Sequence, residues 1–376
     1  MMLRVALVLS LGAQLVEARD SVSFSFGWKH RTGLSAWAKP DDPPPANPDP
    51  GPTPPESKQE YSDSDWERVQ LPHDGLIAAA PSEKACPDGC SGRSYIPRHV
   101  LWYRKSFNLP SDWKGDAVWL DFAGSFRETT VWINGFLAAK HDCGYTPFRV
   151  RLDNITTIKM GGANEIAVFV DPDNGDTGAR DHGSGWWYEG GGLYRNVKLV
   201  HTSAVHIEQD GLFAYSNLTF SSSDSDSEAT GVIHAKAAIT NGGTKPASVC
   251  VVFNVTAPDG SLAAKSAGKA TMTVQPGASA TATAAMPVAS PKLWSSSSPT
   301  LYKVGATVHE GACTTGALLD VVSAPHGFRH LRYDANDGFF LNQKHFKVST
   351  DTVSLPSRLS GGELLAPGSI VRRSLC

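Results

Sequence analysis

Short runs in which apolar and polar residues alternate recur along about the first 200 residues of the chain. Val22–Trp28 follows this two-residue period, and Leu101–Phe107 and Val118–Phe122 are further short, strand-like runs. The period is typical of β-strands that bury one face, so we predict a strand for each run. Asn134 and Gly135 follow another strand-like run and predict a tight hairpin, because both residue types tolerate positive φ.

A second series of strand-like runs begins near residue 204. Ala204–Ile207, Gly231–Thr240, Ser248–Thr256 and Ala270–Val274 are the predicted strands. Alternation along the second of them puts Ile233, Ala235, Ala237 and Ile239 on one face and Val232, His234, Lys236 and Ala238 on the other. No helical period is clear in the tail from Ser349 to Cys376. Short strands separated by turn signals favour β-sandwiches, so we predict an all-β chain.

The stretch Gly183–Arg195 combines a row of three aromatic residues with a row of three glycines. Trp186, Trp187 and Tyr188 precede the glycines at 190, 191 and 192, and the run Leu193–Leu199 is strand-like. Aromatic rings on a tight loop can stack on a sugar ring, and the nearby Asp181, His182 and Glu189 would bond its hydroxyls. The alternative is that the loop packs its rings into its own domain, as glycine-rich corners often do.

This stretch resembles the Trp-Tyr-x-Gly-x-Gly-Ile-Tyr-Arg signature of the sugar-binding domain of glycoside hydrolase family 2. That family includes β-galactosidases, β-glucuronidases and β-mannosidases. Further motifs resemble the patterns of the family and follow its order. They are Trp66–Asp74 (Trp-x-x-Val-x-Leu-Pro-His-Asp), Leu101–Phe107, Thr129–Gly135, Gly144–Phe148, Asn164–Val170, Leu293–Tyr302, Gly327–Arg329 and Asp337–Asn342. Gln343 stands where the family usually has glycine, and the resemblance ends at about Lys347.

The resemblance implies a jelly-roll, galactose-binding-like sandwich over residues 19–203 and an immunoglobulin-like sandwich over residues 204–325. Residues 326–347 resemble the start of a TIM-barrel domain. We expect the chain to be truncated before that barrel, with an unmatched tail over residues 348–376. Residues 39–57 are dense in proline and aspartate, and we expect them to form a disordered insert.

Hydrolysis of a glycosidic bond usually requires two carboxylates, which lie roughly 5 Å apart in retaining enzymes. The resemblance places both on the barrel, which needs roughly 200 residues or more. Beyond Asp351 the only acidic residue is Glu363. We therefore assign no catalytic residue.

The resemblance also implies that loops of the first domain reach the rim of the active site. The residues that match best are His73, Asp74, Asp181, His182, Trp187 and Tyr188. For His73 and Asp74 the alternative is structural, with both side chains bonding backbone groups and bracing their loop. Gly185 falls near the place where some relatives carry a metal-binding aspartate, so we expect neither a metal nor a cofactor.

The N-terminal sequence and the cysteines indicate the cellular compartment of the protein. Met1–Ala18 combines Arg4, an apolar run and a small-residue cleavage site, which predicts a secretory signal; the run is too short for a membrane anchor. Six cysteines are then free to pair, with Cys86 and Cys90 as one local option. Asn154, Asn217 and Asn254 begin N-glycosylation sequons. We expect a protein that is secreted or resides in the lumen of the secretory pathway.

The net charge of -3 gives no basic surface for nucleic acid, and three hypotheses for function remain. In the first, the chain is the sugar-binding front of a β-galactosidase-like hydrolase of O-glycosyl bonds and is inactive alone. In the second, it is a secreted, non-catalytic, lectin-like protein that binds a β-galactoside or a related glycoside. In the third, it is a scaffold that self-associates or binds a protein through the surface that the barrel covers in the family.

Overall fold

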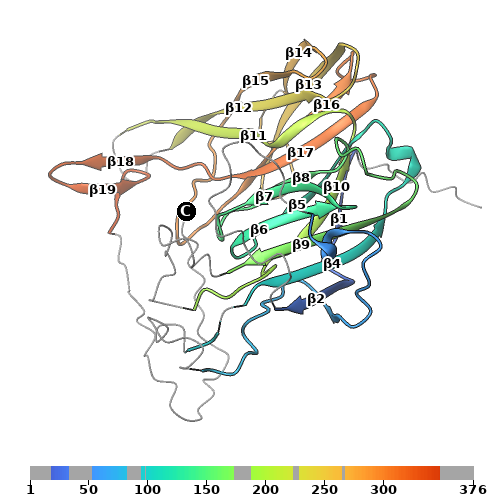
Figure 1. Ribbon diagram of the computed structural model, residues 1–376. Coiled ribbons are helices and arrows are strands. Elements are labelled where there is room, and N and C mark those ends of the chain that lie inside the picture. Colours follow the sequence, from blue (N-terminus) through green and yellow to red (C-terminus); the bar gives the residue numbers. More distant parts are fainter. Residues whose placement is uncertain are drawn as a thin grey trace, which may run out of the picture.

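The computed structural model describes residues 18–33, 53–82, 95–97, 99–172, 188–222, 228–264 and 267–347. Within these ranges the regular elements are β-strands and one-turn 3-10 helices, without any α-helix, so the all-β prediction is confirmed. No helix in these ranges has the length and apolar character needed to cross a bilayer. The strands form two sandwiches that follow one another along the chain (Figure 1).

The first sandwich consists of two antiparallel sheets with the strand orders β1-β10-β5-β8 and β3-β2-β4-β9-β6-β7. Its strands are β1 (Arg19–Ser23), β2 (Trp28–Thr32), β3 (Glu67–Val69), β4 (Leu101–Asn108), β5 (Ala117–Phe122), β6 (Glu128–Ile133), β7 (Phe136–His141), β8 (Phe148–Arg151), β9 (Ala163–Asp171) and β10 (Val197–Thr202). Side chains from both sheets, such as Trp28, Tyr103 and Phe122, are fully buried in the shared core. The predicted hairpin is confirmed, because Asn134 and Gly135 join β6 to β7 with φ of 51° and 81°.

Two predicted strands of this sandwich are shorter than expected. The run Val22–Trp28 is not one strand: β1 ends at Ser23, and β2 begins at Trp28 in the other sheet. The two-residue period of burial breaks at this crossing, because Phe24 is buried and Phe26, two residues later, is exposed. Similarly, the strand expected from Leu193 begins at Val197, because residues 193–196 belong to the loop that carries the glycines.

The end of the predicted disordered insert has a regular structure. Pro55–Ser57 forms the 3-10 helix η1, and the side chain of Ser57 is buried while its hydroxyl donates to the carbonyl of Pro54 (2.8 Å). The prediction of disorder up to residue 57 is therefore wrong for its last residues. Residues 39–52 of the predicted insert lie outside the described residues.

The second sandwich packs the sheet β11-β12-β15 against the sheet β14-β13-β16-β17. Its strands are β11 (Val205–Phe220), β12 (Ala229–Asn241), β13 (Ala247–Thr256), β14 (Gly268–Val274), β15 (Ser279–Val288), β16 (Tyr302–Glu310) and β17 (Leu318–His326). The face of β12 with Ile233, Ala235, Ala237 and Ile239 is buried, and the face with His234 and Lys236 points outward. The predicted division of this strand into two faces is confirmed.

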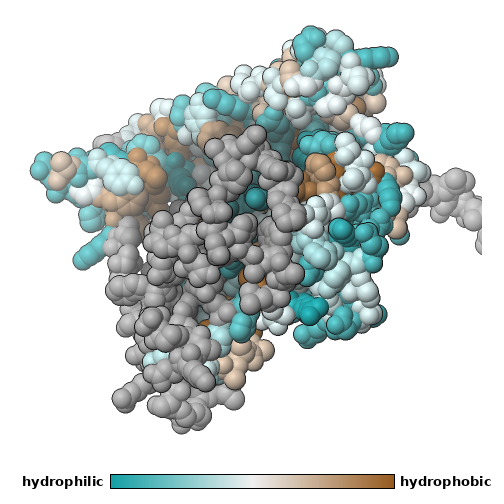
Figure 2. Space-filling view, in the orientation of Figure 1, coloured by the Kyte–Doolittle hydropathy of each residue, from teal (hydrophilic) through white to brown (hydrophobic). Residues whose placement is uncertain are grey.

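A hairpin extends from the second sandwich at the left of Figure 1. It comprises β18 (Leu331–Asp334), β19 (Gly338–Leu341) and the two-residue strand β20 (Lys344–His345). Phe328 anchors its start, since that ring is buried in the core of the second sandwich and packs edge-on against Tyr302. Apolar residues lie at the surface of this hairpin, at the left of the space-filling view (Figure 2).

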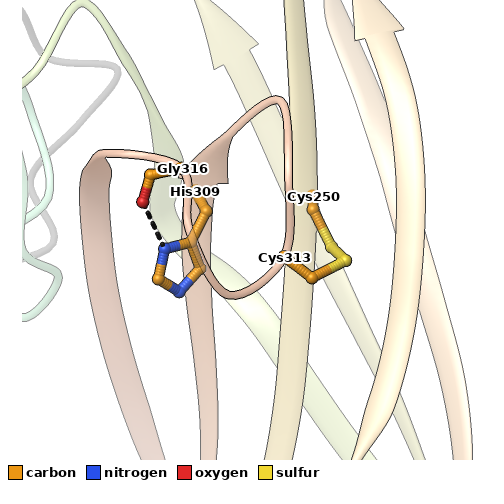
Figure 3. Close-up of a disulfide and its surroundings, with 4 residues drawn as sticks. All are labelled: Cys250, His309, Cys313 and Gly316. Carbon is orange, nitrogen blue, oxygen red and sulfur yellow. Dashed lines mark hydrogen bonds between the residues drawn. A yellow bond between two sulfur atoms is a disulfide. The ribbon is translucent and has the colours of Figure 1, made fainter.

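A disulfide between Cys250 and Cys313 ties two parts of the second sandwich together (Figure 3). Cys250 is buried in β13, and Cys313 lies in the loop that joins β16 to β17. The same loop is held by His309, whose Nδ1 lies 3.2 Å from the carbonyl oxygen of Gly316. Cys86 and Cys90, the possible local pair, lie outside the described residues.

Candidate functional site

The loop after β3 runs alongside the glycine-rich stretch, although about 115 residues separate them in the sequence. The His73 amide donates to the carbonyl of Leu193 (2.9 Å), and the Gly75 amide donates to the carbonyl of Gly191 (2.9 Å). Before this loop, the Leu71 amide donates to Ser25 and the Leu71 side chain enters the core. The apolar residue that ends the strand-like run thus fixes where the two polar residues after it are placed.

Asp74 connects this loop to the glycine-rich stretch through its side chain. Its Oδ1 accepts hydrogen bonds from the amides of Leu76 (2.9 Å) and Gly191 (3.2 Å). Its Oδ2 accepts a hydrogen bond from the Tyr188 hydroxyl (2.9 Å). Burial, with the neighbouring Asp74, raises the pKa of Tyr188 well above its usual value, so the phenol keeps the proton that it donates. We call these contacts the Asp74 latch.

His73, Tyr103 and His30 form a second cluster beside the latch. Nδ1 of His73 lies 2.9 Å from the Tyr103 hydroxyl, and the His30 ring lies 4.8 Å from each of the other two rings. Burial, followed by the nearby His73, lowers the pKa of His30 to about 4. Burial also lowers the pKa of His73. Both imidazoles are therefore neutral at pH 7 and take part through hydrogen bonding and packing.

Two of the three glycines are required because neighbouring side chains lie too close to leave room for a Cβ atom. Gly190 has a φ of 75°, and a Cβ there would lie 2.6 Å from Oδ2 of Asp74. Gly192 has a φ of 112°, and a Cβ there would lie 2.2 Å from the Tyr103 hydroxyl. Any other residue would be strained by its φ and would also collide with the latch or with the buried tyrosine. The glycine pattern is thus explained by contacts inside the first sandwich.

A depression of about 400 Å³ opens beside these clusters. It is lined by His30, Arg31, Thr32, Asp65, Trp66, Glu67, His73, Asp74, Gly75 and Ala78. Carboxylates, imidazoles and a hydroxyl predominate in this lining. They offer several hydrogen-bond donors and acceptors in a small space, which suits a ligand rich in hydroxyl groups.

Three of the six predicted binding residues come together here. His73, Asp74 and Tyr188 adjoin one another, while Asp181, His182 and Trp187 lie outside the described residues. For Asp74 the structural alternative is realised, because its carboxylate braces the loop. The sequence prediction missed His30 and Tyr103. The only feature that could have indicated Tyr103 is its polar hydroxyl group within an otherwise apolar part of the predicted strand.

Arg104 joins two acidic residues of the first sandwich, the partly buried Asp63 and the buried Glu165. Arg104 is buried, and its guanidinium lies 3.1 Å from Asp63 and 3.4 Å from Glu165. Glu165 also accepts a hydrogen bond from Ser106 (2.6 Å), although burial raises its pKa. Neither carboxylate faces the other across open space. In the described ranges, no group of three or more His, Cys, Asp or Glu side chains is arranged to hold a metal ion.

Known proteins share both the sequence pattern and the fold. Residues 206–329 match the family model described as glycosyl hydrolases family 2. A β-glucuronidase of Formosa agariphila is 28% identical over 297 residues, which are 77% of this chain and 29% of that protein. A β-galactosidase of Bacteroides ovatus is 27% identical over 339 residues, which are 90% of this chain and 35% of that protein.

Solved structures agree with these sequence matches. A β-glycosidase from Bacteroides vulgatus superimposes with a TM-score of 0.66 at 28% identity, covering 86% of this chain and 36% of that one. A β-glucuronidase of Bacteroides uniformis shares the fold with a TM-score of 0.69, covering 88% and 34%. The chain spans about a quarter to a third of the length of the curated relatives it matches. With its motifs in family order and two matching β-sandwiches, this chain belongs to glycoside hydrolase family 2.

Proposed function

We propose that this chain is the sugar-facing part of a glycosidase that cleaves O-glycosyl bonds of β-galactosides or β-glucuronides. The Asp74 latch carries this proposal. It joins Tyr188 and the glycine-rich stretch to Asp74, which lines the polar depression, and these are the segments whose motifs resemble the rim of the family's active site. The names of the relatives, β-glucuronidase and β-galactosidase, support this class of substrate.

We also propose that the chain does not hydrolyse glycosides alone. The reaction needs two carboxylates that face each other roughly 5 Å apart across the bond to be broken. In the described part of the first sandwich, the partly buried Asp63 and the buried Glu165 are instead joined through Arg104. A carboxylate bound to a guanidinium has its charge satisfied and is a poor nucleophile or acid.

Two measurements test these proposals. The purified chain should release no 4-nitrophenol from 4-nitrophenyl β-galactoside or β-glucuronide, and steady turnover would contradict the proposed inactivity. Titration calorimetry with methyl β-galactoside and methyl β-glucuronide should detect binding of at least one of them. Asp74→Ala should weaken that binding by about tenfold to a hundredfold, because Asp74 lines the depression and loss of a charged hydrogen bond costs about 1.5–3 kcal/mol. Asp112→Ala, at an exposed aspartate outside the depression, is the matched control and should bind normally.

A second function, that of a lectin-like protein, is favoured by the depression itself. All of its lining residues come from the first sandwich. Binding with a Kd in the micromolar range and without turnover would support an independent binding role. Flat isotherms for both glycosides would count against this role and also against the proposed sugar-facing role of the chain.

We further propose that the protein passes through the secretory pathway, as the predicted signal and sequons suggest. Support comes from the Cys250–Cys313 disulfide, since such bonds persist mainly in oxidising compartments. We also propose self-association through the hairpin of β18 and β19, where Tyr333 is 78% exposed. Light scattering should then give a mass that rises with concentration, and Tyr333→Ser should reduce that rise.

A further inference from the structure

A row of aromatic rings lies on the outer surface of the second sandwich. Phe213 and Tyr215 project from β11 and are 58% and 41% exposed. His234 lies opposite Tyr215 in the register of β11 and β12, and the two rings stack 4.9 Å apart. Exposed aromatic rings in a row usually mark a surface that something covers.

Asn217 continues this row. Residues two apart in a strand point to the same side of a sheet, so Tyr215, Asn217 and Thr219 share the outer face of β11. Asn217 is exposed, and its Nδ2 lies 3.4 Å from Nε2 of His234, the residue that stacks on Tyr215. Asn217 and Thr219 are also the first and third residues of a glycosylation sequon. The amide that would carry a glycan therefore adjoins the aromatic rings.

We propose that Asn217 carries an N-linked glycan whose first sugars lie along Tyr215 and Phe213. In the attachment step, Nδ2 forms a bond to C1 of a lipid-pyrophosphate-linked oligosaccharide. The bond from C1 to the phosphate oxygen breaks, the lipid pyrophosphate leaves, and Nδ2 loses one proton. The linked amide keeps one N–H, which can still donate to His234. The C–H face of the sugar then packs on the faces of the rings, whose negative π-faces attract polarised C–H groups.

The other two sequons lack such a surface. Asn154 is exposed in a turn, but the residue two before it, Leu152, is buried in the core. Asn254 is half-buried in the inner strand β13, where its amide lies against Gly305 of β16. A glycan on either would find no aromatic ring two residues earlier in the sequence. Only the Asn217 sequon has both an exposed acceptor and an aromatic row, which makes the other two internal controls.

The position of the proposed glycan on β11 would also affect the solubility of the protein. β11 is an edge strand of its sheet, with β12 as its partner on one side. Edge strands with exposed apolar side chains tend to pair with other chains unless they are blocked. A bulky, hydrated glycan beside Tyr215 would cover the rings and hinder such pairing. The inference rests on the proposed passage through the secretory pathway and is independent of any glycosidase activity.

The occupancy of the site is tested by mass spectrometry. The chain from Arg19 onward is secreted from a eukaryotic host behind a leader of that host, and glycopeptides covering the three sequons are quantified. Asn217 should be occupied in most molecules. A peptide with unmodified Asn217 beside a modified Asn154 or Asn254, or no modification at all, overturns the proposal. The same chain expressed from Met1 tests the predicted signal separately, because retention inside the cell would refute secretion alone.

The ring contact is tested by a cycle of four variants measured by thermal unfolding. Asn217→Gln should lower the Tm of the secreted protein by about 2 °C or more, as expected for a loss near 1 kcal/mol in a domain of this size. In the Tyr215→Ser background the same change should lower Tm by less than half as much. Equal losses in both backgrounds would overturn the ring contact. Phe26→Ser, at an exposed ring remote in sequence from every sequon, is the control background and should leave the full effect.

Unglycosylated protein from bacteria separates the effect of the glycan on Tm from the effect of the Asn217 amide. There, Asn217→Gln should leave Tm unchanged, because no sugar is lost. A loss in bacterial protein equal to that in secreted protein would assign the effect to the contact with His234 and would refute the proposed role of the sugar.

Discussion

Arg19 and Asp320 join the first strand of the chain to the second sandwich. The guanidinium of Arg19 in β1 contacts both carboxylate oxygens of Asp320 in β17, at 3.0 and 2.6 Å. The Asp320 side chain is fully buried and also accepts a hydrogen bond from the Ile207 amide (2.7 Å). Arg19 in turn donates to the carbonyl of Ile207. A buried carboxylate with a bidentate arginine is a specific joint between the two sandwiches.

Removing Arg19 should destabilise this joint strongly. Arg19→Ala leaves Asp320 buried without a cation, and breaking a buried pair costs about 3–5 kcal/mol. Urea unfolding should show that loss. Arg151→Ala removes an exposed pair with Asp153 and should cost less than about 1 kcal/mol. If both variants lose the same free energy of unfolding, the joint contributes no more than a surface ion pair.

The glycine at 192 should not tolerate a side chain. Gly192→Ala would place a Cβ 2.2 Å from the Tyr103 hydroxyl at a φ of 112°. Strain and overpacking of about 1–3 kcal/mol each should add, which lowers stability and loosens the Asp74 latch. The control is Gly277→Ala, where φ is 67° and nothing lies within 4 Å of the added Cβ. It should show the backbone strain alone. Denaturant unfolding and amide exchange at residues 190–193 measure both effects, and equal values for the two variants would contradict the collision.

Acid should destabilise the first sandwich through His30. Burial lowers the pKa of His30 from 6.5 to about 4, so between these values the unfolded chain binds a proton that the folded chain does not. The contribution of neutral His30 to the free energy of unfolding is therefore fully present above pH 6.5 and is lost as the pH falls towards 4. The total loss from His30 is about 3 kcal/mol, and His73 adds to it in the same direction.

Substitution of His30 should flatten this pH dependence. The free energy of unfolding is measured by urea titration at several values between pH 4.5 and 7.5. His30→Gln cannot be protonated and should reduce the slope below pH 6.5, whereas the exposed His99→Gln should leave it unchanged. A parental slope that persists in His30→Gln would place the acid sensitivity elsewhere.

Loss of the disulfide should destabilise the second sandwich. Cys250 and Cys313 are 63 residues apart, and closing a loop of this length in the unfolded chain stabilises the folded state by about 4 kcal/mol. Cys313→Ser and treatment of the parent with a reductant should each lower the free energy of unfolding by a similar amount. Cys143→Ser, at an exposed free cysteine, should have little effect. A further loss when Cys313→Ser is reduced would show that another bond contributes.

Local patterns predicted those features that neighbouring residues decide. The Asn134–Gly135 hairpin follows from two residues that tolerate positive φ, and the buried face of β12 follows from the two-residue period. The same period failed between Ser23 and Trp28. Phe24 is buried and Phe26 is exposed although they lie two residues apart, because the chain leaves β1 and enters the other sheet at this point.

The candidate site was only partly accessible to such patterns. The sequence motifs singled out His73, Asp74 and Tyr188, but they left open whether the polar residues face a ligand or brace a loop. That question depends on hydrogen bonds such as the one from Tyr188 to Asp74, which spans 114 positions. His30 is a strand residue without a distinctive motif, and only the packing of β2 against β4 brings it to the depression.

The sequence by itself thus determined the class of the fold, the family and the residues from which a site would be drawn. Periodicity and turn chemistry act over a few residues, so they can be recognised in one dimension. Only the tertiary structure decided that Asp74 is a latch, that Arg19 reaches Asp320, and that Cys250 pairs with Cys313. Each of these contacts joins distant segments, and sheet packing, rather than any local preference, brings their atoms within bonding distance.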